Sequence, residues 1–195
     1  MKNKGLLIIG ALLVILFVWG CNARKNLINA DEDINTKWAA VQNQYKRRAD
    51  VFMNQAELVK GAAANEKGIL TAVTNARAGI TDAQSKMGSA NTLADMDKQL
   101  AAVQTAATNF KITVEQYPNI RSTDAFLKFQ DEISGTENRV SKVREDYIDL
   151  VNPYNKMVRN FPNNIFASMF GFKKRDNFTA KESEQDAQKI DVMPK

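Results

Sequence analysis

Apolar residues recur every three or four positions along most of the chain beyond residue 28, which is the spacing of amphipathic helices. Sustained alternation of the kind that strands show is missing from the sequence. The spacing predicts four helices, over about residues 29–60, 69–87, 92–117 and 123–161. The chain is therefore predicted to be all-α.

Local signals place the ends of these helices. Asn29 begins a pattern that resembles a capping box, so we expect the first helix of the body to start there. Gly61 marks a kink or a turn. Asn91 or Thr92 can cap the third helix, and Pro118 should stop it. The breaks are short, which favours antiparallel neighbours.

The fourth helix carries the longest apolar stripe. At 1.5 Å per residue, residues 123–161 would extend roughly 55–60 Å, so the stripe needs partners of similar length. An up-and-down four-helix bundle of long antiparallel helices, with coiled-coil-like packing, meets that need. Gly135 interrupts the helix, and we expect a neighbouring helix to approach its backbone closely.

The N-terminus is a separate apolar segment. Lys2 and Lys4 precede an apolar run of 15 residues from Leu6 to Gly20, which suits a signal peptide or a short membrane-spanning helix. Val18-Trp19-Gly20-Cys21 resembles a bacterial lipobox, which would make Cys21 the lipidated new N-terminus. The alternative is a single span that ends near Trp19. Both anchors predict a bacterial membrane protein whose body lies outside the cytoplasm.

These segments suggest a division of the chain into four parts. Residues 1–21 form the signal peptide with its lipobox, or the span, and residues 22–28 form a short linker. Residues 29–172 form the helical bundle. Residues 173–195 hold many charges and few apolar residues, so we expect a disordered tail.

Composition narrows the possible chemistry. The chain has no His and one Cys, which excludes a zinc hydrolase, a Ser-His-Asp triad and a Cys-His dyad as these are usually built. The net charge of +5 is mild, and no basic stripe with interleaved aromatics suggests nucleic acid. We expect no catalytic residues, no metal and no cofactor.

Charged residues near the apolar stripes form the first candidate site. Arg48 falls at the edge of a stripe, and a buried charge must be paired. The candidate polar cluster is Arg47, Arg48, Asp50, Glu66, Arg77, Glu137 and Arg139. Such a cluster could be a salt-bridge network that fixes helix register, or a site that binds a small anion or ion.

A second candidate lies after Pro162. The patch consists of Ile165, Phe166, Met169, Phe170 and Phe172, and basic residues follow it. An aromatic, amphipathic segment of this kind suits a membrane interface or a groove on a partner. The alternative is a short helix that folds over the end of the bundle.

Several motifs together resemble the LemA family. They are Arg47-Arg48-Ala49-Asp50, Val59-Lys60-Gly61, Ser134-Gly135-Thr136-Glu137-Asn138-Arg139 and Phe161-Pro162, within a region from about Asn29 to Phe178. The resemblance implies an up-and-down four-helix bundle behind an N-terminal membrane segment, and no established enzymatic activity. We therefore expect a non-enzymatic, membrane-anchored scaffold with an unidentified envelope partner. The alternative is a sensor that binds a small anion through the Arg/Glu cluster.

Overall fold

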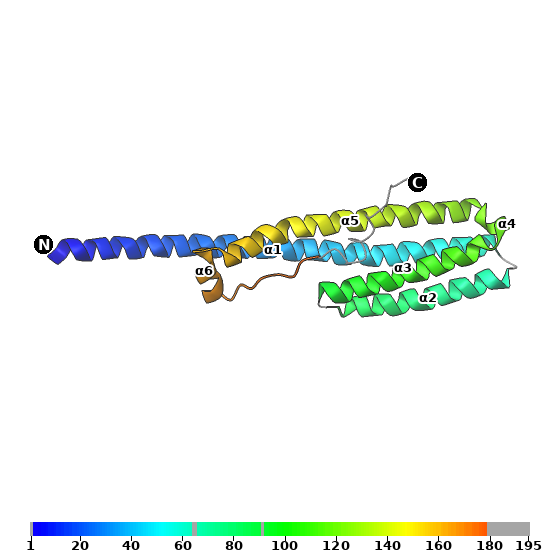
Figure 1. Ribbon diagram of the computed structural model, residues 1–195, viewed down its shortest axis with the longest axis horizontal. Helices are drawn as coiled ribbons and strands as arrows, with labels where there is room; N and C mark the ends of the chain where they lie inside the picture. Colours follow the sequence, from blue (N-terminus) through cyan, green and yellow to red (C-terminus); the bar gives the residue numbers. More distant parts are fainter. Residues whose placement is uncertain (1, 64–65, 91, 179–195) are drawn as a thin grey trace, which may run out of the picture.

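The computed structural model describes residues 2–63, 66–90 and 92–178 of the chain. The helices are α1 (Lys2–Ala62), α2 (Lys67–Gly88), α3 (Leu93–Glu115), α4 (Pro118–Arg121), α5 (Asp124–Arg159) and α6 (Asn163–Met169). The four long helices alternate in direction along one common axis (Figure 1). The all-α, up-and-down bundle expected from the sequence is confirmed.

Helix α1 is one continuous helix of 61 residues, so the expected start at Asn29 was wrong. Residues 22–28, expected as a linker, are helical. Ala23 and Leu27 are buried and continue the spacing that leads to Ile34, and this burial stabilises the helix where a linker was expected. Asn29 is an exposed residue inside the helix. The apolar segment and the body are therefore joined without a break.

The other helix ends follow the sequence signals closely. Gly61 lies in the last turn of α1, next to the turn that leads into α2. Thr92 caps α3, and its Oγ1 accepts a hydrogen bond from the N–H of Asp95 at 3.1 Å. Helix α5 ends at Arg159, so Phe161 lies beyond it and is 79% exposed, not part of the core stripe.

The densest part of the core is a group of aromatic rings contributed by α1, α3 and α5. The rings of Phe52, Phe110, Phe126 and Phe129 meet with centroids 5.2–5.9 Å apart. Most of these contacts are edge-to-face, the geometry that aromatic pairs favour. This group ties three helices together near the α4 end of the bundle.

The α2–α3 hairpin is much shorter than its neighbours. Helices α2 and α3 have 22 and 23 residues, whereas α5 has 36. At 1.5 Å per residue the hairpin reaches about 35 Å and α5 about 54 Å. The C-terminal part of α5 and the part of α1 beside it therefore extend past the hairpin toward the apolar N-terminal segment. Residues 171–178 run beside them (Figure 1).

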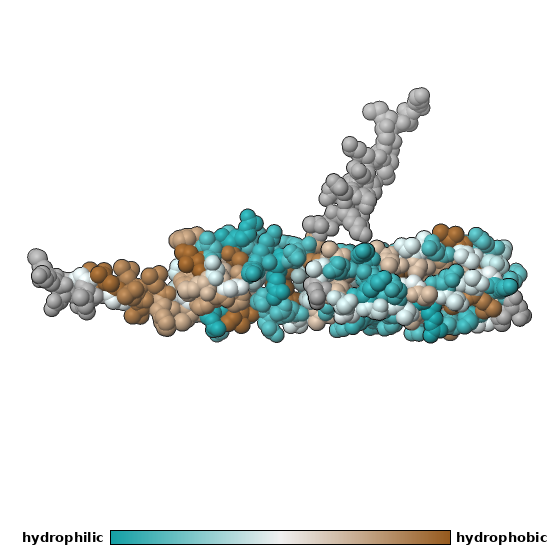
Figure 2. Space-filling view, turned by 90° about the horizontal axis from the view of Figure 1, so that it is seen from below, coloured by the Kyte–Doolittle hydropathy of each residue, from teal (hydrophilic) through white to brown (hydrophobic). Residues whose placement is uncertain are grey.

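The N-terminal part of α1 stands clear of the body. The large apolar side chains described between Ile8 and Trp19 are exposed, and this helix is long and apolar enough to cross a membrane. Figure 2 shows the hydrophobic surface of this segment continuing onto the adjoining end of the body. An exposed apolar surface of this kind is typical of a segment that contacts a membrane or another protein.

Candidate functional site

A partly buried polar group joins three helices in the bundle. The Tyr45 hydroxyl of α1 donates a hydrogen bond to Asp97 Oδ1 of α3 at 2.8 Å and accepts one from Arg144 Nε of α5 at 2.6 Å. Arg144 also forms an ion pair with Asp97, which closes the triangle. The Arg144 guanidinium lies 5.4 Å from the Tyr45 ring centroid. All three helices are therefore held in one register.

The electrostatics of this triangle favour a structural role. Burial raises the pKa of the Tyr45 hydroxyl well above its usual value of 10.0, and the nearby Arg144 charge opposes that shift only in part. Tyr45 therefore stays protonated as a hydrogen-bond donor at neutral pH. The hydroxyl is occupied by Asp97 and Arg144, so the group is poorly suited to act as a base or nucleophile.

Arg48 forms a second polar contact on α1. Its guanidinium donates to Gln104 Oε1 of α3 and lies 3.7 Å from Glu137 Oε2 of α5. Arg48 is buried, whereas the Glu137 side chain is 61% exposed. Burial lowers the pKa of Arg48, and the negative charge of Glu137 opposes that effect. The ion pair with Glu137 thus compensates the buried positive charge of Arg48.

The rest of the candidate polar cluster makes other contacts. Asp50 accepts a hydrogen bond from Gln84 at 2.7 Å, and Arg77 forms an ion pair with Glu57 at 3.1 Å. Glu66 is the residue before α2, and Arg47 and Arg139 are exposed on their helices. Of the seven candidate residues, the structure thus brings together Arg48 and Glu137.

The sequence did not single out Asp97 and Arg144. Each follows a core position directly, Met96 in α3 and Val143 in α5, which is the only local signal that they carry. Tyr45 was placed in the apolar stripe, but its partners lie 52 and 99 positions away along the chain. Their meeting depends on how the helices pack, which the periodicity alone does not specify.

The described part of the tail is ordered, which corrects the expectation of disorder for residues 173–178. The Asn155 side chain of α5 donates to the Arg175 carbonyl and accepts from the Arg175 N–H, both at 2.9 Å. Tyr154 donates to the Lys173 carbonyl at 3.0 Å. These contacts satisfy backbone groups of the tail segment. Residues 179–195 lie outside the described part of the chain.

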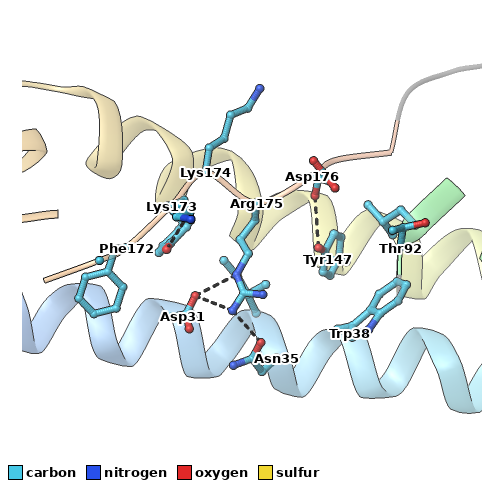
Figure 3. A pocket seen from close by; sticks show the side chains of 14 residues that line it. Asp31, Asn35, Trp38, Thr92, Tyr147, Phe172, Lys173, Lys174, Arg175 and Asp176 are labelled. Carbon is cyan, nitrogen blue, oxygen red and sulfur yellow. Dashed lines mark hydrogen bonds and ion pairs between the residues drawn. The ribbon is translucent and has the colours of Figure 1, made fainter. Parts of the chain in front are cut away.

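Arg175 attaches the same segment to α1. Its guanidinium donates to Asp31 Oδ1 at 2.8 and 3.0 Å and to Asn35 Oδ1 at 3.0 Å. Phe178 packs edge-on against Tyr147, with ring centroids 5.6 Å apart. Figure 3 shows Arg175 pointing from the tail toward Asp31 and Asn35. The segment 171–178, which we call the strap, thus bridges α1 and α5.

A groove of about 410 Å³ lies beside the strap. Asp31, Trp38, Thr92, Tyr147 and Arg175 are among the side chains that line it (Figure 3). Two of its charged groups are paired with each other, since Arg175 forms an ion pair with Asp31, and Lys173, Lys174 and Asp176 also line it. Within the described residues, no group of three or more His, Cys, Asp or Glu side chains could hold a metal ion.

The C-terminal patch lies next to the apolar N-terminal segment. Phe166 of α6 meets Trp19 edge-on, with ring centroids 5.8 Å apart. Phe172 is partly buried against the core, whereas Ile165, Met169 and Phe170 are exposed. Cys21, the predicted lipidation site, is an exposed free thiol. Its lipidation stays a prediction.

Comparison with known proteins agrees with this architecture. The model of the LemA family matches residues 37–192. Magnetosome protein MamQ 2 of Paramagnetospirillum magneticum is 25% identical over 90% of this chain and 72% of its own length. Protein LemA of Metamycoplasma hominis is 23% identical over 89% of this chain and 77% of its own length. Because the family model covers most of the helical body, the chain belongs to the LemA family.

Proposed function

We propose that the protein is a non-enzymatic scaffold of the bacterial envelope, anchored in a membrane through the N-terminal part of α1. One observation carries this proposal: the apolar segment and the bundle share a single uninterrupted helix of 61 residues. A continuous helix holds the bundle at a set height and orientation, whereas a flexible linker would let it rotate. The terminal amine, Lys2 and Lys4 favour a body outside the cytoplasm.

The far end of the bundle is the surface proposed to meet the partner. It exposes one large apolar side chain on each of three helices: Leu58 (57%) on α1, Ile112 (51%) on α3 and Leu127 (50%) on α5. All three lie close to the helix ends that adjoin α4. Exposed apolar residues at the end farthest from the anchor are well placed for contact with another envelope protein.

Site-specific photo-crosslinking in cells tests this proposal. A photoreactive residue at position 58, 112 or 127 of the full chain should give a discrete crosslinked band that contains a second protein. Asn29, an exposed residue of α1 near the anchor, is the matched control position and should give none. The absence of a distinct adduct at all three far-end positions would reject the scaffold role at this surface.

The form of the anchor has its own test. The alternative is that the chain is cut before Cys21 and that Cys21 carries lipid, because the residues before it resemble a lipobox and the apolar run is short for a span. In that case residues 1–20 would be removed and lipid, not α1, would be the anchor. Mass spectrometry of the mature N-terminus should then find a lipidated Cys21 as the first residue. An intact Met1 would show instead that the whole of α1 is retained as a spanning helix.

A further inference from the structure

Helix α6 and Phe161, which lies just before it, expose apolar side chains beside the end of the apolar N-terminal segment of α1. Phe161 is 79% exposed, Ile165 55% and Met169 64%. The neighbouring Phe166 packs on the last turn of that segment: it meets Trp19, and a Cβ on Gly20 would lie 2.9 Å from its ring. The exposed side chains are therefore at the level where the apolar part of α1 ends.

The geometry of α6 directs these side chains away from the bundle. Ala167 is 1% exposed and packs into the core. Helical periodicity places Ile165 and Met169 together on the face opposite Ala167. In Figure 1, α6 crosses the direction of α1 and does not run along it. A helix that crosses a membrane-spanning helix lies along the plane of the membrane.

Basic residues follow the apolar segment on α1 and follow α6 along the chain. The Arg24 guanidinium lies 5.6 Å from the Phe170 ring centroid, and Lys25, Lys173 and Lys174 are exposed. Along α1, the first acidic residue after the apolar segment is Asp31, and Arg175 already binds it. Apolar side chains bordered by exposed cations are the pattern of a segment that lies in the interface of an anionic bilayer.

We propose that Phe161, Ile165 and Met169 insert into the interfacial layer of the membrane beside Trp19, with the surrounding basic residues over acidic lipid headgroups. The proposal rests on the membrane anchoring proposed above. A lipid surface is favoured over a protein partner because the patch is continuous with the apolar segment (Figure 2). This second contact would stop the body from tilting freely about a single anchor.

Lipid quenching of a fluorescent probe tests the proposal in the full chain. The substitution Cys21→Ser first removes the native cysteine, so that residues 1–20 are retained. One new cysteine can then carry an environment-sensitive dye. The dye is placed at position 165 or 169, and the protein is reconstituted in phosphatidylcholine and phosphatidylglycerol vesicles with nitroxide-labelled lipids. Position 127, where Leu127 is 50% exposed at the far end, is the matched control. Position 14, inside the apolar segment, reports on the anchor itself.

We expect the lipids to quench the dye at positions 14, 165 and 169 at least about twofold more than at position 127. Quenching at 14 with none at 165 and 169 would overturn the interfacial role of α6 and leave the anchor intact. A blue-shifted but unquenched dye at 165 would overturn it in favour of a protein partner or a second copy. An unquenched dye at 14 would reject the membrane anchor and this proposal together.

Discussion

At the scale of single residues, Gly135 is the clearest departure from the sequence-based expectation. A neighbouring helix was expected to approach its backbone, but a Cβ built there would have no heavy atom within 4 Å. The expectation was wrong because a glycine within a helix does not by itself indicate whether a neighbouring helix packs against that position. Gly68 is the opposite case, since a Cβ there would overlap the Tyr117 hydroxyl.

The substitution Gly135→Ala should therefore stabilise the protein. Alanine reduces the conformational entropy of the unfolded chain, and a gain of about 0.5–1 kcal/mol in the free energy of unfolding is expected. Chemical denaturation measures it, with Gly68→Ala as the comparison that should destabilise. A loss of stability in Gly135→Ala would mean that the space at this position is not open.

Tyr45 predicts a dependence of stability on alkaline pH. Its pKa is raised in the folded state above the ordinary 10.0, so the folded protein keeps a proton that the unfolded chain releases. Stability should thus be complete below about pH 10 and fall as the pH rises further. In Tyr45→Phe this contribution is absent, so the fall between about pH 8 and pH 11 should be smaller. Parallel falls in both proteins, measured by urea denaturation, would contradict the assignment.

At the scale of helices, the strap depends on side chains of α5. Asn155→Ala removes both 2.9 Å hydrogen bonds to the Arg175 backbone. Each such bond contributes about 0.5–1.5 kcal/mol, so local opening of the strap should become several-fold more frequent. Trypsin should then cut after Lys173 and Lys174 correspondingly faster. Asn138→Ala, which changes an exposed asparagine of the same helix, is the control and should leave the rate unchanged.

The helices show what the sequence could and could not predict. Thr92 and Pro118 were read correctly because their effect on a helix is local. The start at Asn29 was wrong because a capping pattern was outweighed by the burial of Ala23 and Leu27 against residues distant in sequence. The strap was missed for the same reason: its charged composition suggests disorder, but α5 and Asp31 supply partners for its polar groups.

At the scale of the whole molecule, the continuity of α1 makes the chain a rigid arm. Val14 and Lys46 are 32 residues apart on one helix, so spin labels at these positions should lie about 48 Å apart along its axis, with a narrow distribution. Asn29→Pro would remove a backbone hydrogen bond inside the helix and should broaden that distribution. Pulsed electron resonance on the reconstituted Cys21→Ser chain measures both, with Asn29→Ala as control. A distribution in Asn29→Ala that is as broad as in Asn29→Pro would show that residues 22–28 already act as a hinge.

The uninterrupted helix also fixes how the bundle is rotated about the α1 axis relative to the apolar N-terminal segment. Each residue of an α-helix advances the azimuth by about 100° and the height by about 1.5 Å. The number of residues between Gly20 and Ile34 therefore sets which side of the bundle faces a neighbour in the membrane plane, and whether Phe166 still meets Trp19. Evolution of this segment by single insertions would turn the whole body about its axis. Changes in its length should be confined to steps near whole numbers of turns.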